Sequence, residues 1–335
     1  MEGRKLQLAG KSTFLVSLPK RWVTNAGLKA GDTLFVEPER DGSVSIRLRN
    51  GTRPVVRRKS FVERGEETRE HLLRKLVGAY VSGFGLIDVR FSAARGPFVR
   101  KVSREFCRLV IGPEVIEETP TSILIQDLSD PSELSSEKCL RRMHLTVRSM
   151  LEDAVEALKP GHATLAHDVE ARSQDVNRLN WMVAKQYHLA HAGPPEADGA
   201  LSIHGHRLIA KLLERIGEHA QRIAKCGAEL TAERPLDPKL LEQLSEARSS
   251  AVTILDKAFQ ALVTRNIDAA NQAIDARVEH QKLIDALVQR AANRRGSSLL
   301  TLGTIVDSLS RTAVYASEIA EEAIDLAVAS APEAA

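Results

Sequence analysis

The first 60 residues carry a concentration of cationic side chains that could neutralise the phosphates of a polyanion. They contain 13 lysines and arginines against 5 acidic residues, which gives a net charge of +8. The rest of the chain holds 34 basic and 39 acidic residues, a net charge of −5. Lysine and arginine gathered at one end of a chain supply sequence-independent affinity for nucleic acid. This distribution favours a polyanion-binding segment over the alternative of an arginine-rich surface that only keeps the domain in solution.

Short β-strands are expected to hold these cations in residues 1–55, the segment that we call the head. Large apolar side chains alternate with smaller ones, at the period of a half-buried strand, in residues 14–18, 33–36 and 43–48. Asp41-Gly42 predicts a hairpin turn, because glycine tolerates the positive φ that a tight turn needs. Pro19 starts one short helical turn that ends near Gly27, with Trp22 as a core residue beneath it. Because so few residues bury little core, we expect the head to dimerise.

Four short motifs follow one another in the head. They are Arg4-Lys5-Leu6-Gln7, Gly10-Lys11-Ser12, Val16-Ser17-Leu18-Pro19-Lys20 and Gly27-Leu28-x-x-Gly31-Asp32. In this order the motifs resemble the AbrB/MazE/SpoVT swapped-hairpin domain, and the similarity covers residues 3–48. The resemblance implies an intertwined homodimer that binds DNA, with candidate contacts at Arg4, Lys5, Lys11, Lys20 and Arg21. Family members also serve mainly as dimerisation or protein-binding modules, and that alternative stays open.

Residues 56–137 predict a small α/β connector domain. We expect two helices and three strands, in the order α-β-α-β-β, over residues 66–81, 86–91, 98–110, 115–119 and 122–126. The basic stretch Arg53–Lys59 is interpreted as the segment that leaves the head. No glycine-rich phosphate loop, metal-ligand spacing or nucleophile arrangement is visible in the connector. Arg95, Lys101 and Arg104 could bind an anion or extend a DNA surface, with a solvated helix face as the alternative.

From residue 138 onward the hydrophobic period becomes 3.6, which predicts long amphipathic helices. The pattern is interrupted at Gly193-Pro194-Pro195, Pro235 to Pro238 and Arg295-Gly296. An internal repeat is present, because two segments recur: Met150–Leu158 is similar to Ile254–Leu262, and Glu214–Ala224 is similar to Ser310–Ala320. Two copies of a three-helix unit, side by side, are the simplest architecture that these segments allow.

The first repeat carries motifs that identify a family. Its third helix reads Glu214-Arg-Ile-Gly-Glu218-His-Ala220, and its second helix has Leu165-Ala166-x-x-Val169 and then Val176-Asn177-x-Leu179. These segments resemble PhoU over about residues 140–326. The resemblance implies a regulator that acts on phosphate transport and on its transcriptional control. Fusion to an AbrB-like head is an arrangement common in archaea, in which the sensor would act directly on DNA.

The PhoU resemblance also implies a candidate metal site. Family members often bind a metal cluster, of a divalent metal or iron, through carboxylates four residues apart on adjacent helices, and Glu214 and Glu218 keep this spacing. The facing positions are Ser173 and Asn177, which carry no charge, and the second repeat lacks both third-helix carboxylates. We therefore expect no certain cofactor, and a helix face paired with Lys211 is the alternative for Glu214 and Glu218.

Other chemistry-bearing residues predict neither catalysis nor membrane insertion. His188 and His191 are interpreted as loop side chains, and His204 and His206 as surface side chains. Three widely separated cysteines fit a reducing cytoplasm. The sequence has no apolar run of 18 residues and no signal-peptide pattern, so we expect a soluble cytoplasmic protein that is not an enzyme.

These observations predict a multidomain protein. It combines a swapped-hairpin β-domain, a small α/β connector and an all-α pair of three-helix bundles, over residues 1–55, 56–137, 138–232 and 233–328. We predict a homodimeric, DNA-binding transcriptional regulator of phosphate uptake and phosphate homeostasis, with the PhoU-like half as signal or partner module. The alternative is an adaptor that inhibits the ATPase of a phosphate ABC transporter, with the head used only for dimerisation.

Overall fold

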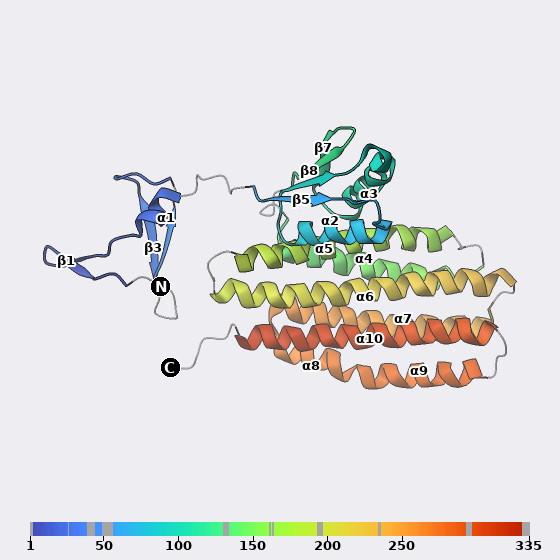
Figure 1. The fold of residues 1–335 in the computed structure, drawn as a ribbon. Helices are drawn as coiled ribbons and strands as arrows, with labels where there is room; N and C mark the ends of the chain where they lie inside the picture. Colours follow the sequence, from blue (N-terminus) through green and yellow to red (C-terminus); the bar gives the residue numbers. More distant parts are fainter. Residues whose placement is uncertain are drawn as a thin grey trace. The chain divides into compact units, whose positions relative to one another are not determined.

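The structure is a computed structural model, and it divides into two compact units, Met1–Val55 and Val56–Ala335 (Figure 1). It describes residues 3–25, 27–38, 44–48, 56–129, 134–160, 162, 164–192, 197–233, 236–292 and 297–329. The predicted turn at Asp41-Gly42 lies outside these residues, as do the breaks at Gly193-Pro194-Pro195 and Arg295-Gly296.

The described part of the head contains two antiparallel strand pairs and one short helix. The elements are β1 (Gln7–Ala9), β2 (Thr13–Leu15), α1 (Lys20–Asn25), β3 (Leu34–Pro38) and β4 (Val44–Leu48). β1 pairs with β2, and β3 pairs with β4, with Val36 opposite Ile46. Gly10 has a φ of +71° in the turn between β1 and β2, a conformation that glycine adopts without strain. β2, β3 and β4 overlap the alternating runs at residues 14–18, 33–36 and 43–48, and α1 overlaps the helical turn expected after Pro19, whereas β1 lies in none of these runs.

The second unit begins with a four-stranded sheet in the order β5-β6-β8-β7. Its strands are β5 (Arg58–Val62), β6 (Leu86–Arg90), β7 (Pro113–Glu118) and β8 (Ser122–Asp127). β5 is parallel to β6, and the other neighbours are antiparallel. The expected order α-β-α-β-β was therefore incomplete. The basic stretch that was interpreted as the exit from the head includes the first residues of β5, and its ladder partner β6 lies 28 positions along the chain.

The sheet packs against α2 (Arg69–Val81) and α3 (Gly96–Leu109), with a short 3-10 turn at Ala93–Arg95 before α3. The Thr68 hydroxyl accepts a hydrogen bond from the His71 amide at the start of α2. Gly83, with a φ of +76°, ends this helix, and the Phe84 amide donates back to the Ala79 carbonyl over 3.1 Å. In Figure 1, α2 lies between the sheet and the long helices.

The rest of the described chain is helical. The helices are α4 (Ser136–Glu156), α5 (Thr164–Ala192), α6 (Ala197–Glu233), α7 (Pro238–Thr264), α8 (Ile267–Asp275), α9 (Arg277–Ala292) and α10 (Ser297–Ala329). Asp237 caps α7 with Pro238 at its first position, and Asn266 caps α8. The first repeat has three helices, whereas the middle helix of the second repeat is divided into α8 and α9. The equivalent motifs lie 64 positions apart in the first repeat (150 to 214) and 56 apart in the second (254 to 310), so the divided middle helix belongs to the shorter repeat.

One continuous hydrophobic core runs through both helical repeats. The equivalent residues Met150 and Ile254 are both buried, and so are Ala220 and Ala316. α6 of the first repeat packs along α10 of the second, and the long helices lie side by side in Figure 1. Equivalent residues of the two sequence repeats therefore contribute to one common core.

The bundle buries the imidazole of His280, which is poorly hydrogen-bonded. His280 is 2% exposed, and among the described residues neither of its ring nitrogens makes a hydrogen bond of normal geometry. We expect His280→Leu to raise the free energy of unfolding at neutral pH by about 1–3 kcal/mol, because leucine leaves no buried polar group unsatisfied. Chemical denaturation of the full chain measures this gain, and a loss of stability would contradict it.

The same substitution is expected to reduce the acid sensitivity of the fold. Burial lowers the pKa of His280 below its ordinary value. As the pH falls below about 6.5, the unfolded state takes up a proton first, so stability that is complete at higher pH is lost. Denaturation at about pH 7.5 and about pH 5.5 should show a smaller loss in His280→Leu than in the original chain. The exposed His167→Leu is the matched control and should leave the loss unchanged.

Candidate functional site

The five candidate DNA contacts lie on the first hairpin and at the start of α1. Arg4 and Lys5 precede β1, Lys11 lies in the turn between β1 and β2, and Lys20 and Arg21 begin α1. All five side chains belong to exposed residues. The Arg4 guanidinium donates a hydrogen bond of 3.4 Å to the Ser17 hydroxyl, which joins the segment before β1 to the segment after β2. The cations are therefore presented to solvent on short, hydrogen-bonded elements.

The head also exposes its large apolar side chains. Within residues 3–24 and 27–36 and at positions 44 and 46, where burial is described, no residue is buried in the single chain. Leu6, Phe14 and Val36 are 67%, 64% and 62% exposed, and Trp22, which was expected to fill a core, remains 36% exposed. Isolated exposed apolar residues are ordinary, but several large ones exposed on so short a segment contribute little apolar burial to its stability. These apolar side chains are therefore open to contact with a further surface.

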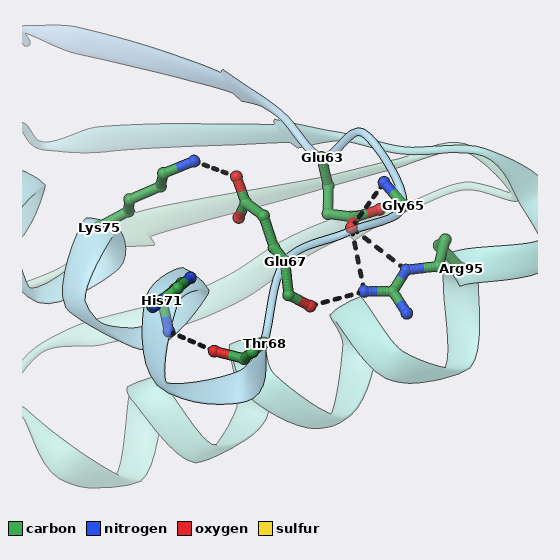
Figure 2. Close-up of polar contacts among 7 residues, drawn as sticks. All are labelled: Glu63, Gly65, Glu67, Thr68, His71, Lys75 and Arg95. Carbon is green, nitrogen blue, oxygen red and sulfur yellow. Dashed lines mark hydrogen bonds and ion pairs between the residues drawn. The ribbon is translucent and has the colours of Figure 1, made fainter.

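The connector holds Arg95 in a buried ion pair. The Arg95 guanidinium donates to a Glu63 carboxylate oxygen over 3.0 and 3.1 Å and to the Glu67 carbonyl over 2.8 Å (Figure 2). The Glu63 side chain is fully buried, and the Gly65 amide donates to the same carboxylate oxygen. Although burial opposes ionisation, the hydrogen bond from Arg95 and its charge hold the pKa of Glu63 below its ordinary value. Arg95 is thus held in the fold by its ion pair, and it is neither a solvated surface residue nor a free cation.

A second buried ion pair joins the connector to the bundle. The Lys185 ammonium on α5 contacts the Asp127 carboxylate at the end of β8, and both side chains are less than 10% exposed. Lys185 also donates to the Ser129 hydroxyl over 3.0 Å and lies 5.0 Å from the centre of the Tyr80 ring. The Tyr80 hydroxyl donates to the Ile111 carbonyl over 3.0 Å. Polar and aromatic groups therefore fix the sheet and α2 to α5.

The two candidate metal ligands lie on α6 in different surroundings. Glu214 is buried and paired with Lys211, one helical turn before it. Glu218 is exposed, and partial burial together with the charge of Glu214 raises its pKa. On the facing helix α5, Ser173 is buried and donates a hydrogen bond of 3.4 Å to Gln221, beyond the two glutamates.

This donor set does not fit a multi-metal cluster. Within the described ranges, no group of three or more histidine, cysteine, aspartate or glutamate side chains is placed to hold a metal ion. A cluster needs several anionic or imidazole ligands around each ion. Instead, Lys211 already supplies a positive charge beside Glu214. Metal binding through Glu214 and Glu218 stays a prediction that the surrounding residues do not strengthen.

The structure buries polar residues of α6 that the sequence did not distinguish from surface residues. His206 was interpreted as a surface side chain, yet it is 8% exposed and lies 2.8 Å from the Ser136 hydroxyl. Arg207 donates over 2.8 Å to the buried Asn180 on α5. His188 and His191 were interpreted as loop residues and instead lie within α5. A signal for Arg207 was available, because positions 207, 211, 214 and 218 form one stripe at helical spacing.

Comparison with protein families finds a similarity in the first helical repeat. Residues 140–227 match the family model of the PhoU domain. This segment is similar to the PhoU domain. It extends from α4 through α5 into α6, and it includes the stripe that carries Glu214 and Glu218. No curated protein sequence matches the chain.

Solved structures of PhoU proteins share the helical architecture. The crystal structure of PhoU from Pseudomonas aeruginosa aligns with a TM-score of 0.53 and 21% identity, over 57% of this chain and 94% of that one. The phosphate transport system regulatory protein PhoU from Streptococcus pneumoniae aligns with a TM-score of 0.51 and 17% identity, over 57% and 92% of the two chains. At these identities the likeness shows the fold alone, so the helical half has the fold of the PhoU proteins.

Proposed function

We propose that the chain is a homodimeric DNA-binding regulator of phosphate uptake, in which the head binds DNA and the PhoU-like half receives the signal or a partner. The observation that carries the proposal is the head, which combines five exposed cations with uncovered apolar side chains. A second copy would cover the apolar side chains, and the cations of the two copies would contact phosphates along one DNA duplex. An AbrB-like swapped-hairpin dimer supplies both features in one fold.

The role of the helical half rests on its PhoU domain and PhoU fold. The Streptococcus pneumoniae protein of the same fold is named for regulation of the phosphate transport system. We carry this role to the present chain as a proposal, together with a cytoplasmic location and an archaeal type of domain fusion. In the part of the chain that is described, no helix combines the length and the apolar character needed to cross a membrane.

DNA binding by the intact chain tests the proposal. Fluorescence anisotropy with duplexes from promoters of phosphate-uptake genes should show an affinity that falls steeply as salt rises, because phosphate contacts release counterions. Lys11→Ala with Arg21→Ala should weaken binding to all duplexes and reduce the salt slope by about two, about one for each lost phosphate contact. The matched control, Arg64→Ala with Arg74→Ala in the connector, removes the same charge from exposed positions outside the head.

The outcome separates two functions. Absent or salt-insensitive binding, or equal affinity of the head variant and the control, would reject a DNA-binding head. The alternative is then an adaptor that inhibits the ATPase of a phosphate ABC transporter, which the PhoU fold of the helical half favours. Recovery of that ATPase in a pull-down by residues 56–335, which form a compact unit of their own, would support the adaptor.

A further inference from the structure

The exposed face of α3 carries a row of cations beside an open hollow. The hollow has a volume of about 660 Å³ and is lined by Pro97, Arg100, Lys101, Arg104, Glu105 and Arg108. The opposite face of α3 is buried in the connector core through Val99, Val102 and Phe106. Packing of that apolar face fixes the helix, so the cations are held on a rigid element and directed away from the core.

Two of these cations are partly neutralised by neighbouring carboxylates. Arg100 and Arg104 share Glu118 of β7, over 2.6 and 3.2 Å, and Arg100 also donates to the Thr119 carbonyl over 3.0 Å. Glu105, the one carboxylate in the lining of the hollow, is paired with Arg69 of α2. The acidic groups beside the row are therefore each engaged by at least one arginine.

The other two cations lack such partners. Lys101 and Arg108 are exposed, and neither forms an ion pair with a described residue. They lie seven residues apart, with Arg104 between them on the same face, so the row extends for roughly 10 Å at 1.5 Å per residue. The lining as a whole therefore has excess positive charge, and this excess lies at the two positions that no carboxylate compensates.

We propose that this face of α3 binds a free anion with several linked phosphate groups, such as a short polyphosphate. A single phosphate is usually held by convergent donors or by backbone amides at a helix N-terminus, whereas these cations form a line on long exposed side chains. Successive phosphates would engage successive cations, and each contact would raise the effective concentration of the next. A hollow beside the row suits a small ligand better than it suits a wide duplex.

Calorimetric titration of the full chain with sodium tripolyphosphate tests this proposal. We expect binding that weakens with added salt and that exceeds the affinity for inorganic phosphate. Lys101→Glu with Arg108→Glu should weaken binding by at least about tenfold, equivalent to about 1.4 kcal/mol. The matched control, Arg64→Glu with Arg74→Glu, makes the same charge change at exposed residues of the same domain and should alter affinity less than about twofold. Both variants should keep the original melting temperature, since they change exposed side chains.

Several results would overturn the proposal. One is an absence of tripolyphosphate binding. Another is an equal loss of tripolyphosphate affinity in the α3 variant and in the control. The third is that the chain binds inorganic phosphate as tightly as tripolyphosphate. Weakened duplex binding by the α3 variant, without tripolyphosphate binding, would assign the row to DNA instead. The site lies on α3 and does not use the cations of the head. Lys11→Ala with Arg21→Ala should therefore leave the tripolyphosphate affinity unchanged.

Discussion

Replacing Lys185 with methionine is expected to lower the free energy of unfolding by about 3–5 kcal/mol. The substitution leaves the Asp127 carboxylate buried without its cation, and it removes the hydrogen bond to the Ser129 hydroxyl. An unpaired buried charge is strongly unfavourable, whereas removal of both charges is much better tolerated. Chemical denaturation of the full chain, followed by the far-ultraviolet circular dichroism of the bundle, measures the loss.

This experiment has a rescue substitution at Asp127 and a control at an exposed ion pair. Asp127→Asn in the Lys185→Met background should recover part of the loss, because the amide carries no charge and still accepts from the Ser129 amide. The comparison is the exposed pair of Lys282 and Glu279, whose side chains are 66% and 75% exposed. Lys282→Met should lower the free energy of unfolding by less than about 1 kcal/mol. A loss at Lys185 no larger than the loss at Lys282 would show that the connector and the bundle do not depend on this ion pair.

Introducing charge on the apolar surface of the head is expected to dissociate the proposed dimer. Phe14→Asp with Val36→Asp should weaken self-association of the full chain by at least about 100-fold. Burial of one large apolar side chain contributes about 2 kcal/mol, and a two-fold interface counts each residue twice. Both side chains are exposed in the single chain, so the variant loses no core contact within one copy. Sedimentation equilibrium measures the change in mass.

The control for dimerisation uses exposed valines in the helical half. Val278 and Val288 on α9 are 63% and 52% exposed, and Val278→Asp with Val288→Asp should leave the mass unchanged. A dimer that persists in the head variant and dissociates in the control would place the interface on the bundle. A monomeric original chain would remove the dimer from the proposed function and would leave the head without a cover for its apolar side chains.

Local patterns in the sequence predicted much of the secondary structure. Alternation in the head predicted its short strands, and the 3.6-residue period predicted the helices from α4 onward. The similarity between Met150–Leu158 and Ile254–Leu262 predicted a repeat whose equivalent residues share one core. These features follow from residue spacing along the chain, which is why they could be read without the fold. Trp22 was expected to be a core residue beneath the helix, but it is 36% exposed in the single chain.

Contacts between segments far apart in the sequence decided the first strand of the sheet and the surroundings of several charged and polar residues. β5 is a strand because β6 pairs with it, and its own sequence reads as a basic exit from the head. The sequence left Arg95 either as an anion or DNA contact or as part of a solvated helix face. In the structure it instead pairs with Glu63, 32 positions earlier in the chain. His206 and Lys185 belong to the interior because a neighbouring segment covers each of them.

The sequence by itself determined where the cations and the repeated helices lie, because charge and periodicity are local properties. Only the tertiary structure decided which cations are already paired inside the fold, as Arg95 and Lys185 are, and which remain exposed, as Lys101 and Arg108 are. The physical reason is that the charge of a lysine or arginine is fixed by its chemistry, whereas its availability depends on the carboxylates that folding brings beside it.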